Sequence, residues 1–458
     1  MRHVVNQRFA RRDRPVLVNN WEATYFDFDE GRILDIASRA KDIGAELVVL
    51  DDGWFGHRDD DTTSLGDWDA DRRKLPGGIV SLSSRIHDMG LEFGLWFEPE
   101  MINMDSDLHR THLEWMVGPL NRGLTPQRNQ YVLDMARPEV VDHLAIRMSR
   151  LISAAHIDYI KWDMNRNITE AYSAALDDGR QGEFFHRYIM GVYALYDRLT
   201  HEHPDVLFES CASGGGRFDL GMMYYAPQAW LSDDTDAVER ALIQYATSYG
   251  YPQSTMGAHV SAVPNHETGR VTPLSTRGDV AFFGDLGYEL DISTTSAQDL
   301  SEMRRQISFY VSHRDVFQRG VLTRLVSPYE GDGNLMAWQV ASHDGNTVIV
   351  ECLRILSRPN PPTCRIRPRG LDCEALYAVS LFDSAAKLAD PGADSSSGTY
   401  YGDELMNLGI LMPQAVDPAS GRRDGDFTSR LVLIERCHGD AAQDSDSDSG
   451  PALESPSL

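Results

Sequence analysis

The sequence predicts an α/β chain: a (β/α)8 TIM barrel, then a small C-terminal all-β sandwich and a disordered acidic tail. Two observations support this fold class. Between residue 15 and about residue 320, short apolar runs alternate with longer helical patterns, as in a parallel barrel. Past about residue 325, short alternating runs replace the helical patterns. The chain of 458 residues is also too long for one ordinary core.

Eight apolar runs are expected to form the barrel strands. They lie at residues 16–19, 47–50, 93–97, 131–133, 159–162, 206–208, 229–231 and 256–260. The helical patterns between them include residues 31–43, 78–89, 138–155, 182–201 and 235–249. A doubly wound sheet is the alternative, but it normally carries a phosphate-type glycine loop after its first strand. That position reads Asn19-Asn20-Trp21-Glu22, which favours the barrel.

The C-terminal part is expected to contain strands at residues 335–340, 347–352, 376–381 and 429–434. The turn from His343 to Asn346 contains Asp-Gly, which is typical of a hairpin. Further on, Asp-Ser repeats cannot build a core. We therefore expect a lead-in at residues 1–14, the barrel at residues 15–324, the sandwich at residues 325–437 and the disordered tail at residues 438–458.

Composition excludes several kinds of partner. The formal net charge of −26 argues against a nucleic acid or an anionic membrane and favours a neutral substrate. No run reaches the ~18 apolar residues needed to span a bilayer, and the arginine-rich N-terminus lacks the apolar centre of a secretory signal. The five cysteines form no Cys-x-x-Cys pair, so neither a zinc site nor a disulfide framework is indicated. A cytoplasmic location is expected.

The most informative segment is residues 157–166, where an apolar run ends in several polar side chains. Strand geometry places Lys161, Asp163 and Asn165 on one face and Trp162 on the other. Polar groups at the end of a buried strand cost desolvation energy, which proteins usually tolerate at a functional site. An ordinary ion pair at a strand end is the alternative.

Two aspartates close predicted strands on opposite parts of the barrel. Asp163 follows the fifth predicted strand and Asp233 the seventh. The carboxyl ends of barrel strands form active sites, and paired carboxylates across such a mouth are typical of glycosidases. Asp236 and Glu239 have the spacing of a capping box, so Asp236 is expected to be a helix N-cap.

Further polar and aromatic strand ends fit a sugar site. Asp51 and Asp52 follow an apolar run and suit hydroxyl groups better than a metal, because no further ligands lie at metal spacing. The indoles of Trp21, Trp54 and Trp96 can pack on a pyranose, although any single one is more often core.

The glycine run at residues 214–216 lacks the ending of a phosphate loop, and close approach of a ligand to its backbone is more plausible. Cys211, just before it, has no local histidine partner, which argues against a thiol nucleophile.

Six motifs in order resemble the α-galactosidases of glycoside hydrolase family 36: LDDGWFG, GLWFEPEM, DYIKWDMNR, ESCASGGGRFD, WLSDDTDAVER and MGAHVSAVPNH. The resemblance covers residues 15 to about 320, and the predicted sandwich is compatible with it. It implies retaining hydrolysis of terminal α-galactosyl groups in raffinose-type oligosaccharides, without a metal or another cofactor.

Carried over position by position, Asp163 resembles the nucleophile and Asp233 the acid/base. Asp51 and Asp52 resemble the pair that holds the galactose hydroxyls, and Trp96 resembles the wall of the sugar pocket. The remaining sugar-contacting positions match Lys161, Asn165, Arg128, Cys211 and, more loosely, Trp21. We expect Lys161 to keep Asp163 ionised, and the acidic neighbours Asp234 and Asp236 to keep Asp233 protonated.

One departure from the family leaves alternatives open. Bacterial members normally carry a large β-sandwich domain before the barrel, whereas the first predicted strand here begins near residue 15. That domain helps assembly and can complete the pocket from a neighbouring subunit, so a homo-oligomer is possible. A fragment, a mis-started reading frame and a short enzyme all fit. A galactosyl transferase and a catalytically weakened sugar-binding fragment are the alternative functions.

Overall fold

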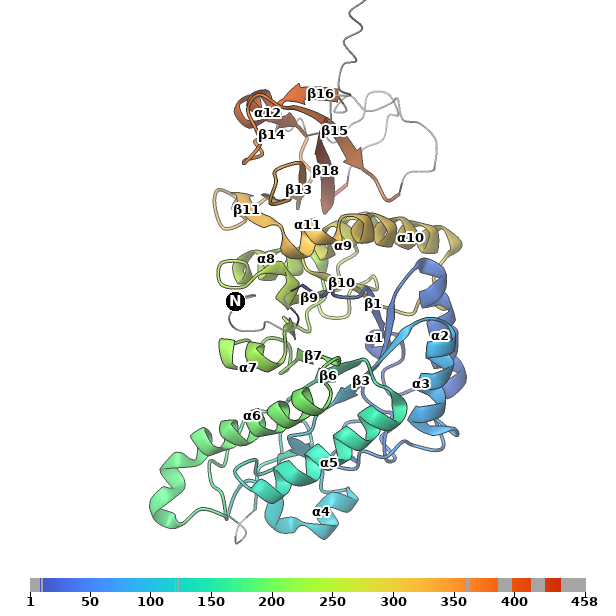
Figure 1. Cartoon of the computed structure of the whole chain (residues 1–458), viewed down its shortest axis with the longest axis vertical. Coiled ribbons are helices and arrows are strands. Elements are labelled where there is room, and N and C mark those ends of the chain that lie inside the picture. The colour runs from blue at the N-terminus through green and yellow to red at the C-terminus, as the bar shows by residue number, and fades with distance from the viewer. Residues whose placement is uncertain are drawn as a thin grey trace, which may run out of the picture.

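The computed structural model contains a closed parallel barrel followed by an antiparallel β-domain (Figure 1). It describes residue 9 and residues 11–119, 121, 123–359, 362–385, 398–412 and 425–437. The eight barrel strands are β1 (Leu17–Asn19), β2 (Leu47–Leu50), β3 (Glu92–Phe97), β6 (Tyr159–Trp162), β7 (Leu207–Ser210), β8 (Gln228–Trp230), β9 (Met256–Ser261) and β10 (Asp285–Glu289). Around the barrel they lie in the order β1-β10-β9-β8-β7-β6-β3-β2.

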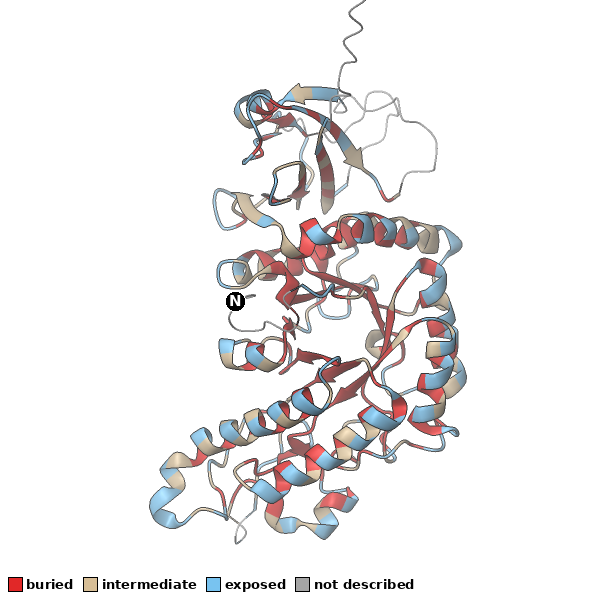
Figure 2. Cartoon of the chain, viewed as in Figure 1, coloured by how far each residue is buried: buried red, intermediate tan, exposed pale blue. Residues whose placement is uncertain are grey.

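Helices surround the barrel, and the longer ones turn a buried face toward the strands and an exposed face outward (Figure 2). The longer ones are α2 (Glu30–Ile43), α3 (Gly78–Asp88), α5 (Pro138–Ala155), α6 (Phe184–Glu202), α8 (Ala237–Thr247), α9 (Leu274–Ala281) and α10 (Ala297–Ser312). The shorter ones are α1 (Trp21–Thr24), α4 (Asp107–Thr111), α7 (Leu220–Tyr225), α11 (Arg314–Arg319) and the 3₁₀ turns Leu113–Trp115, Asp178–Glu183 and Gln253–Thr255. In α5, the buried side chains Val141, Leu144, Ala145, Met148 and Ile152 recur at helical spacing, which fixes the buried face.

The predicted fold class is confirmed, but one barrel strand was assigned wrongly. Tyr131–Val132 (β5) lies outside the barrel, where it pairs antiparallel with β4 (Met101–Ile102). The eighth barrel strand is β10, whose sequence Asp-Leu-Gly-Tyr-Glu begins and ends with an acid and therefore lacks an apolar run. Asp163 consequently follows the fourth barrel strand and Asp233 the sixth.

The C-terminal part forms a six-stranded antiparallel sheet in the order β11-β12-β13-β18-β15-β16. Its strands are β11 (Val321–Val326), β12 (Leu335–Ala341), β13 (Thr347–Arg354), β15 (Leu376–Phe382), β16 (Gly398–Tyr401) and β18 (Thr428–Arg436). A two-stranded sheet of β14 (Arg365–Ile366) and β17 (Ile410–Leu411), together with α12 (Gly402–Leu408), belongs to the same domain. The predicted turn from His343 to Asn346 joins β12 to β13. The predicted disordered tail lies outside the described residues.

The central strands β12 and β13 of the six-stranded sheet are buried on both faces. On β13, Ile349 and Leu353 belong to the large core shared with the barrel, whereas Val348 and Val350 belong to a smaller core with β14 and β17. Successive strand residues point to opposite faces, so a strand buried on both sides becomes a continuous apolar run. This explains the β-branched run at residues 347–350 with which β13 begins.

Stacked aromatic rings dock this sheet on the barrel helices. The rings of Phe283 and Trp338 stack at 4.5 Å, and those of Phe309 and Phe382 at 3.9 Å. Each such pair adds roughly 0.5–1.5 kcal/mol beyond the buried area. Thr276 on α9 donates a hydrogen bond from its hydroxyl to the Phe427 carbonyl (2.8 Å). The sheet therefore continues the barrel's core.

A buried carboxyl group lies within this junction. Glu351 on β13 is fully buried and accepts hydrogen bonds from Trp338 Nε1 (2.5 Å) and Ser429 Oγ (3.2 Å). Burial raises the pKa of Glu351 to about 7. Asp279 on α9 is also buried, and burial followed by the charge of Glu351 raises its pKa well above the ordinary range. The junction therefore holds two acids that resist ionisation.

Within the part of the chain that is described, the model has no helix both long enough and apolar enough to cross a membrane.

Candidate active site

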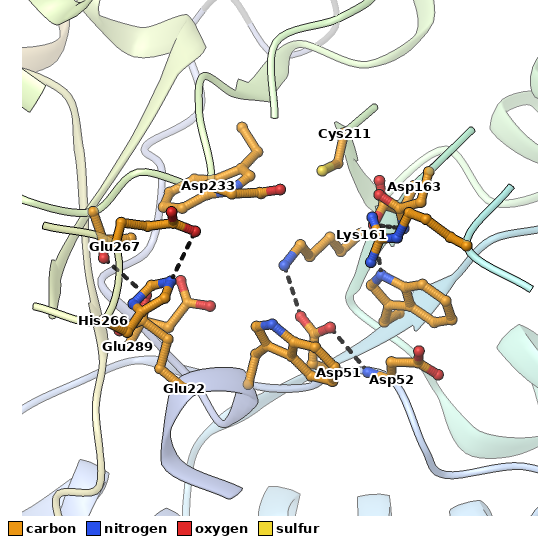
Figure 3. A pocket seen from close by; sticks show the side chains of 16 residues that line it. Glu22, Asp51, Asp52, Lys161, Asp163, Cys211, Asp233, His266, Glu267 and Glu289 are labelled. Atoms are coloured by element: carbon orange, nitrogen blue, oxygen red, sulfur yellow. Dashed lines mark hydrogen bonds and ion pairs between the residues drawn. The ribbon is translucent and has the colours of Figure 1, made fainter. Parts of the chain in front are cut away.

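The loops at the carboxyl ends of the barrel strands surround a cavity of about 160 Å³ (Figure 3). It is smaller than the ~300–1,000 Å³ of typical ligand clefts, so it suits one sugar ring better than a whole oligosaccharide. All ten residues that the family resemblance matched to site positions line it: Trp21, Asp51, Asp52, Trp96, Arg128, Lys161, Asp163, Asn165, Cys211 and Asp233.

Asp163 directly follows β6 and is largely buried in the cavity wall. Its Oδ2 accepts hydrogen bonds from Asn165 Nδ2 (2.6 Å) and Trp96 Nε1 (3.3 Å), and its Oδ1 accepts one from the Met164 amide (2.8 Å). Hydrogen bonds to an ionised acceptor are strong, so these three donors stabilise a carboxylate and fix its direction. The arrangement suits a nucleophile.

Asp233 follows β8 and is open to the cavity. Partial desolvation by the cavity walls raises the pKa of Asp233, and the negative charge of Asp163 raises it further. Trp230 Nε1 donates a hydrogen bond to Oδ1 (3.0 Å). The sequence-based explanation was therefore wrong, because Asp234 and Asp236 are not what raises this pKa. Asp236 is instead the N-cap of α8, as predicted, and accepts from the Val238 and Glu239 amides.

Lys161, which was expected to keep Asp163 ionised, makes its ion pair with Asp51. Lys161 Nζ lies 2.7 Å from Oδ2 of Asp51, which also accepts from Asn19 Nδ2 (2.7 Å). Burial opposes the charge of Lys161, but the charges of Asp51 and Glu289 outweigh it and raise its pKa. Lys161 therefore holds the carboxylate of Asp51 in place. The carboxylate of Asp163 is held by its three hydrogen bonds instead.

Asp52 is held by a cation that the sequence analysis did not identify. The buried guanidinium of Arg58 makes a two-pronged contact with Asp52, from Nε to Oδ1 (2.6 Å) and from Nη2 to Oδ2 (2.8 Å). Burial nevertheless raises the pKa of Asp52, against the influence of Arg58. A carboxylate has about four acceptor positions, so Asp51 and Asp52 remain able to accept hydroxyl donors while their directions are fixed.

Arg128 reaches the cavity from the tip of a two-residue turn. Arg128 and Asn129 both have positive φ (49° and 58°), and Gln127 and Gln130 hydrogen-bond to each other across them. This pattern is that of a type I′ turn, in which two consecutive non-glycine residues are unfavourable. Such strain often accompanies function, and here it places a guanidinium at the cavity, where Nη1 lies 3.5 Å from Ser213 Oγ.

The three tryptophans predicted to face a sugar divide into two groups. Trp21 and Trp96 line the cavity. Trp54 does not, because its indole is fully buried, donates to the Trp96 carbonyl (2.9 Å) and packs on Phe55 and Trp68. Trp54 supports the wall from behind.

The glycine run serves the protein backbone more directly than a ligand. A Cβ atom on Gly214 would lie 2.6 Å from Cα of Ser232, and one on Gly215 would lie 2.7 Å from the Leu231 carbonyl oxygen. Gly214 also has a φ of +79°. The loop after β7 therefore packs directly against the loop that carries Asp233. Burial, followed by the charge of Asp163, raises the pKa of Cys211 well above its usual value, which argues against a thiolate nucleophile.

Six further cavity residues were not predicted: Glu22, Trp230, Thr235, His266, Glu267 and Glu289. Glu289 was missed together with β10, whose last residue it is. The other five had a usable signal, because they directly neighbour Trp21, flank Asp233, or end or directly follow the motif at residues 256–266. In Figure 3, Glu22, His266, Glu267 and Glu289 form the wall on the same side as Asp233.

The groups that line the cavity restrict the ligands that it can bind and the reactions that it can support. Seven carboxyl groups face two obligate cations, Arg128 and Lys161, so an anionic ligand is disfavoured. One carboxylate is held by three donors and another carboxyl has a raised pKa. Environments that separate two acids in this way assign them a base or nucleophile role and an acid role. The cavity can therefore perform acid-assisted displacement on a neutral, hydroxyl-rich ligand.

Comparison with known proteins agrees with this chemistry. The chain is 48% identical over 427 residues to the α-galactosidase AgaA of Geobacillus stearothermophilus, covering 93% of this chain and 55% of AgaA. The crystal structure of the α-galactosidase from Lactobacillus brevis superposes with a TM-score of 0.89 at 54% identity, covering 95% of this chain and 56% of that one. A variant of AgaA in complex with raffinose superposes with a TM-score of 0.86 at 46% identity, covering 94% of this chain and 56% of that one.

The chain thus spans about half the length of the curated relatives that it matches. Family models cover both of its parts. The glycosyl hydrolase family 36 C-terminal domain matches residues 335–434, and Melibiase matches residues 1–320. On these matches, this chain belongs to the Melibiase family of glycoside hydrolases.

Proposed function

We propose that this protein is a retaining α-galactosidase that releases terminal α-linked galactose from raffinose-type oligosaccharides. The observation that carries the proposal is the meeting of Asp163 and Asp233, 70 positions apart in the chain, in one cavity with separated acid–base environments. Retaining glycosidases use one carboxylate as nucleophile and one carboxylic acid as proton donor.

In the first step, a carboxylate oxygen of Asp163 attacks the anomeric carbon of the galactosyl ring. The bond from that carbon to the glycosidic oxygen breaks, and the proton of Asp233 passes to the departing oxygen. The three hydrogen-bond donors hold the Asp163 carboxylate in one orientation before the attack. This orientation favours a short distance between the attacking oxygen and the anomeric carbon. The raised pKa of Asp233 supplies the proton.

In the second step, the ionised Asp233 takes a proton from water. The water oxygen attacks the anomeric carbon and releases Asp163, so galactose leaves with its original configuration. The charge of Asp163 that raised the pKa of Asp233 is neutralised while the sugar is attached. Asp233 is thereby a weaker acid before the first step and a better-ionised base between the steps.

The proposed substrate class follows from the cavity's size, its charge and its relatives. The volume of the cavity suits a single ring, so we expect the remaining sugars of an oligosaccharide to extend outward. Asp51 and Asp52, oriented by Lys161 and Arg58, are proposed to accept hydroxyl groups of that ring. Solved structures of AgaA variants contain raffinose and stachyose, both of which carry terminal galactose.

Other expectations from the sequence stay predictions: a cytoplasmic location, homo-oligomer formation and boundaries near residues 15, 325 and 438. The family models support the second boundary, because one match ends at residue 320 and the other begins at residue 335.

The test is an assay of the purified chain with p-nitrophenyl α-galactoside and with raffinose, together with NMR of the first-formed galactose anomer. Retention predicts α-galactose before mutarotation. Initial formation of β-galactose contradicts the nucleophile role of Asp163. Calorimetric binding of galactose without turnover would make the chain a sugar-binding protein, and longer oligosaccharides at high sugar concentration would make it a transferase.

A further inference from the structure

We propose that Glu22 is a positioning residue that fixes, through Thr235, the segment at residues 231–236 that carries Asp233; this segment is called the Asp233 loop below. The inference deepens the proposed function and rests on the acid/base role of Asp233. It concerns a residue that is neither one of the two reacting carboxyls nor one of the groups that hold them directly.

Three loops meet at Thr235. Its Oγ1 donates a hydrogen bond to Oε1 of Glu22 (2.8 Å), in the helix after β1. The same hydroxyl accepts one from Asn265 Nδ2 (3.1 Å), and the Thr235 carbonyl accepts one from Ser261 Oγ (3.2 Å), both from the end of β9 and the loop after it. Thr235 is buried although it lies two residues after the exposed Asp233. The Asp233 loop is therefore anchored beside its reactive residue.

This anchor matters because Asp233 has little to hold it. In the described part of the structure, its side chain receives one hydrogen bond, from Trp230 Nε1. Proton donation requires the carboxyl and the departing oxygen to approach within about 2.6–3.2 Å, and a misplacement of about 1 Å costs roughly 10²-fold in rate. Glu22 connects the loop to the wall that also carries Trp21, so it fixes the distance from Asp233 to the sugar.

The environment of Glu22 suits an uncharged acceptor. Its side chain is largely buried, and His266 Nδ1 lies 3.6 Å from Oε1, a contact that is an ion pair only when the imidazole is protonated. Burial, followed by the charge of Glu289, raises the pKa of Glu22 to about 9, so the group is neutral at pH 7. A glutamine at this position keeps the shape, the neutrality and an acceptor oxygen for Thr235. This makes E22Q a conservative replacement, whereas E22A removes the anchor.

The experiment compares kcat/KM on two substrates that need the acid to different extents. The value of kcat/KM covers steps up to cleavage of the glycosidic bond. p-Nitrophenolate departs without a proton, whereas the disaccharide alkoxide that leaves from raffinose requires one from Asp233. We expect E22A and T235V to lose about 10- to 100-fold more on raffinose than on p-nitrophenyl α-galactoside. E22Q should remain within about threefold of the parent on both.

Two further variants distinguish a loss of the position of Asp233 from a general loss of stability of the fold. In the double variant E22A/T235V, the loss should not exceed that of T235V alone, because T235V already removes the link to Glu22 together with the hydrogen bond from Asn265. T276V is the matched control: Thr276 is equally buried and makes a hydroxyl bond of the same 2.8 Å length, but at the junction with the C-terminal sheet. T276V should lower the melting temperature without distinguishing the substrates.

The outcomes are distinct. A parent chain that turns over neither substrate overturns the proposed function and this role with it. An active parent whose E22A variant loses equally on both substrates, or whose E22Q variant loses as much as E22A, overturns the role of Glu22 alone. Additive losses in the double variant also overturn it. If E22A fails to fold, T235V tests the same link, because valine keeps the volume of Thr235.

Discussion

Replacement of Glu351 by glutamine should stabilise the folded chain at neutral and alkaline pH. Glu351 is fully buried where the C-terminal sheet packs on the barrel. In the unfolded chain its carboxyl ionises near pH 4.5, but in the folded chain its pKa is about 7. As pH rises from 4.5 to 7, the unfolded state therefore loses this proton first, and the free energy of unfolding falls. Glutamine has no proton to lose.

The magnitude follows from the shift. At 1.36 kcal/mol per pKa unit, the difference between 4.5 and about 7 corresponds to about 3 kcal/mol. At ~2.1 cal/mol/K per residue, the entropy of unfolding of a chain this long converts that into about 3 °C in melting temperature. The amide should be satisfied in place, because its oxygen can accept from Trp338 and its NH₂ group can donate to Ser429.

The assay is calorimetric melting of the parent and E351Q from pH 5 to pH 8. Most of the difference should develop across this range, with E351Q the more stable protein at pH 8. E435Q serves as the control, because Glu435 lies on the neighbouring strand β18 but is exposed. A difference between E351Q and the parent that stays constant within 1 °C from pH 5 to pH 8 would falsify the linkage argument.

Three further predictions concern the cavity. D163A should lower turnover by several orders of magnitude with the fold retained, because it removes the nucleophile; near-normal activity on p-nitrophenyl α-galactoside would exclude that role. D233N should lower kcat/KM on raffinose by about 10²–10⁴-fold and less on the aryl substrate. It should also abolish the fall in kcat/KM at higher pH, since the acid form of Asp233, favoured by its raised pKa, must be present in the free enzyme; an unchanged pH profile contradicts the assignment. G214A should reduce activity, because its Cβ would lie 2.6 Å from Cα of Ser232 beside Asp233. G250A is the control, since a Cβ there meets nothing within 4 Å, and equal activities of the two variants would remove the packing argument.

Much of the barrel could be predicted because its signals are local. Seven of its eight strands are apolar runs, and these runs lie where they were expected. The eighth strand, β10, was missed because acids occupy both of its ends. The predicted run at Tyr131 is a real β-strand, but its partner is β4. Local pattern identifies an extended segment without saying which sheet receives it.

For the site, too, the sequence showed which residues belong to it but not which of them contact one another. Strand-end chemistry and motif resemblance identified ten residues that line one cavity. They did not identify which cation pairs with which carboxylate. Lys161 was expected to keep Asp163, two positions away, ionised, and the structure shows its ion pair with Asp51, 110 positions away. Arg58 was not singled out at all, although it holds both oxygens of Asp52.

The sequence by itself determined the alternation of strands and helices, the acids at the strand ends and the neutral character of a suitable ligand, because periodicity, residue type and net charge are properties of the chain. Only the tertiary structure decided which donors hold Asp163, what raises the pKa of Asp233 and which wall supports each carboxyl. Those properties depend on burial and on charges a few ångströms away, and closure of the barrel brings such neighbours together from distant parts of the chain.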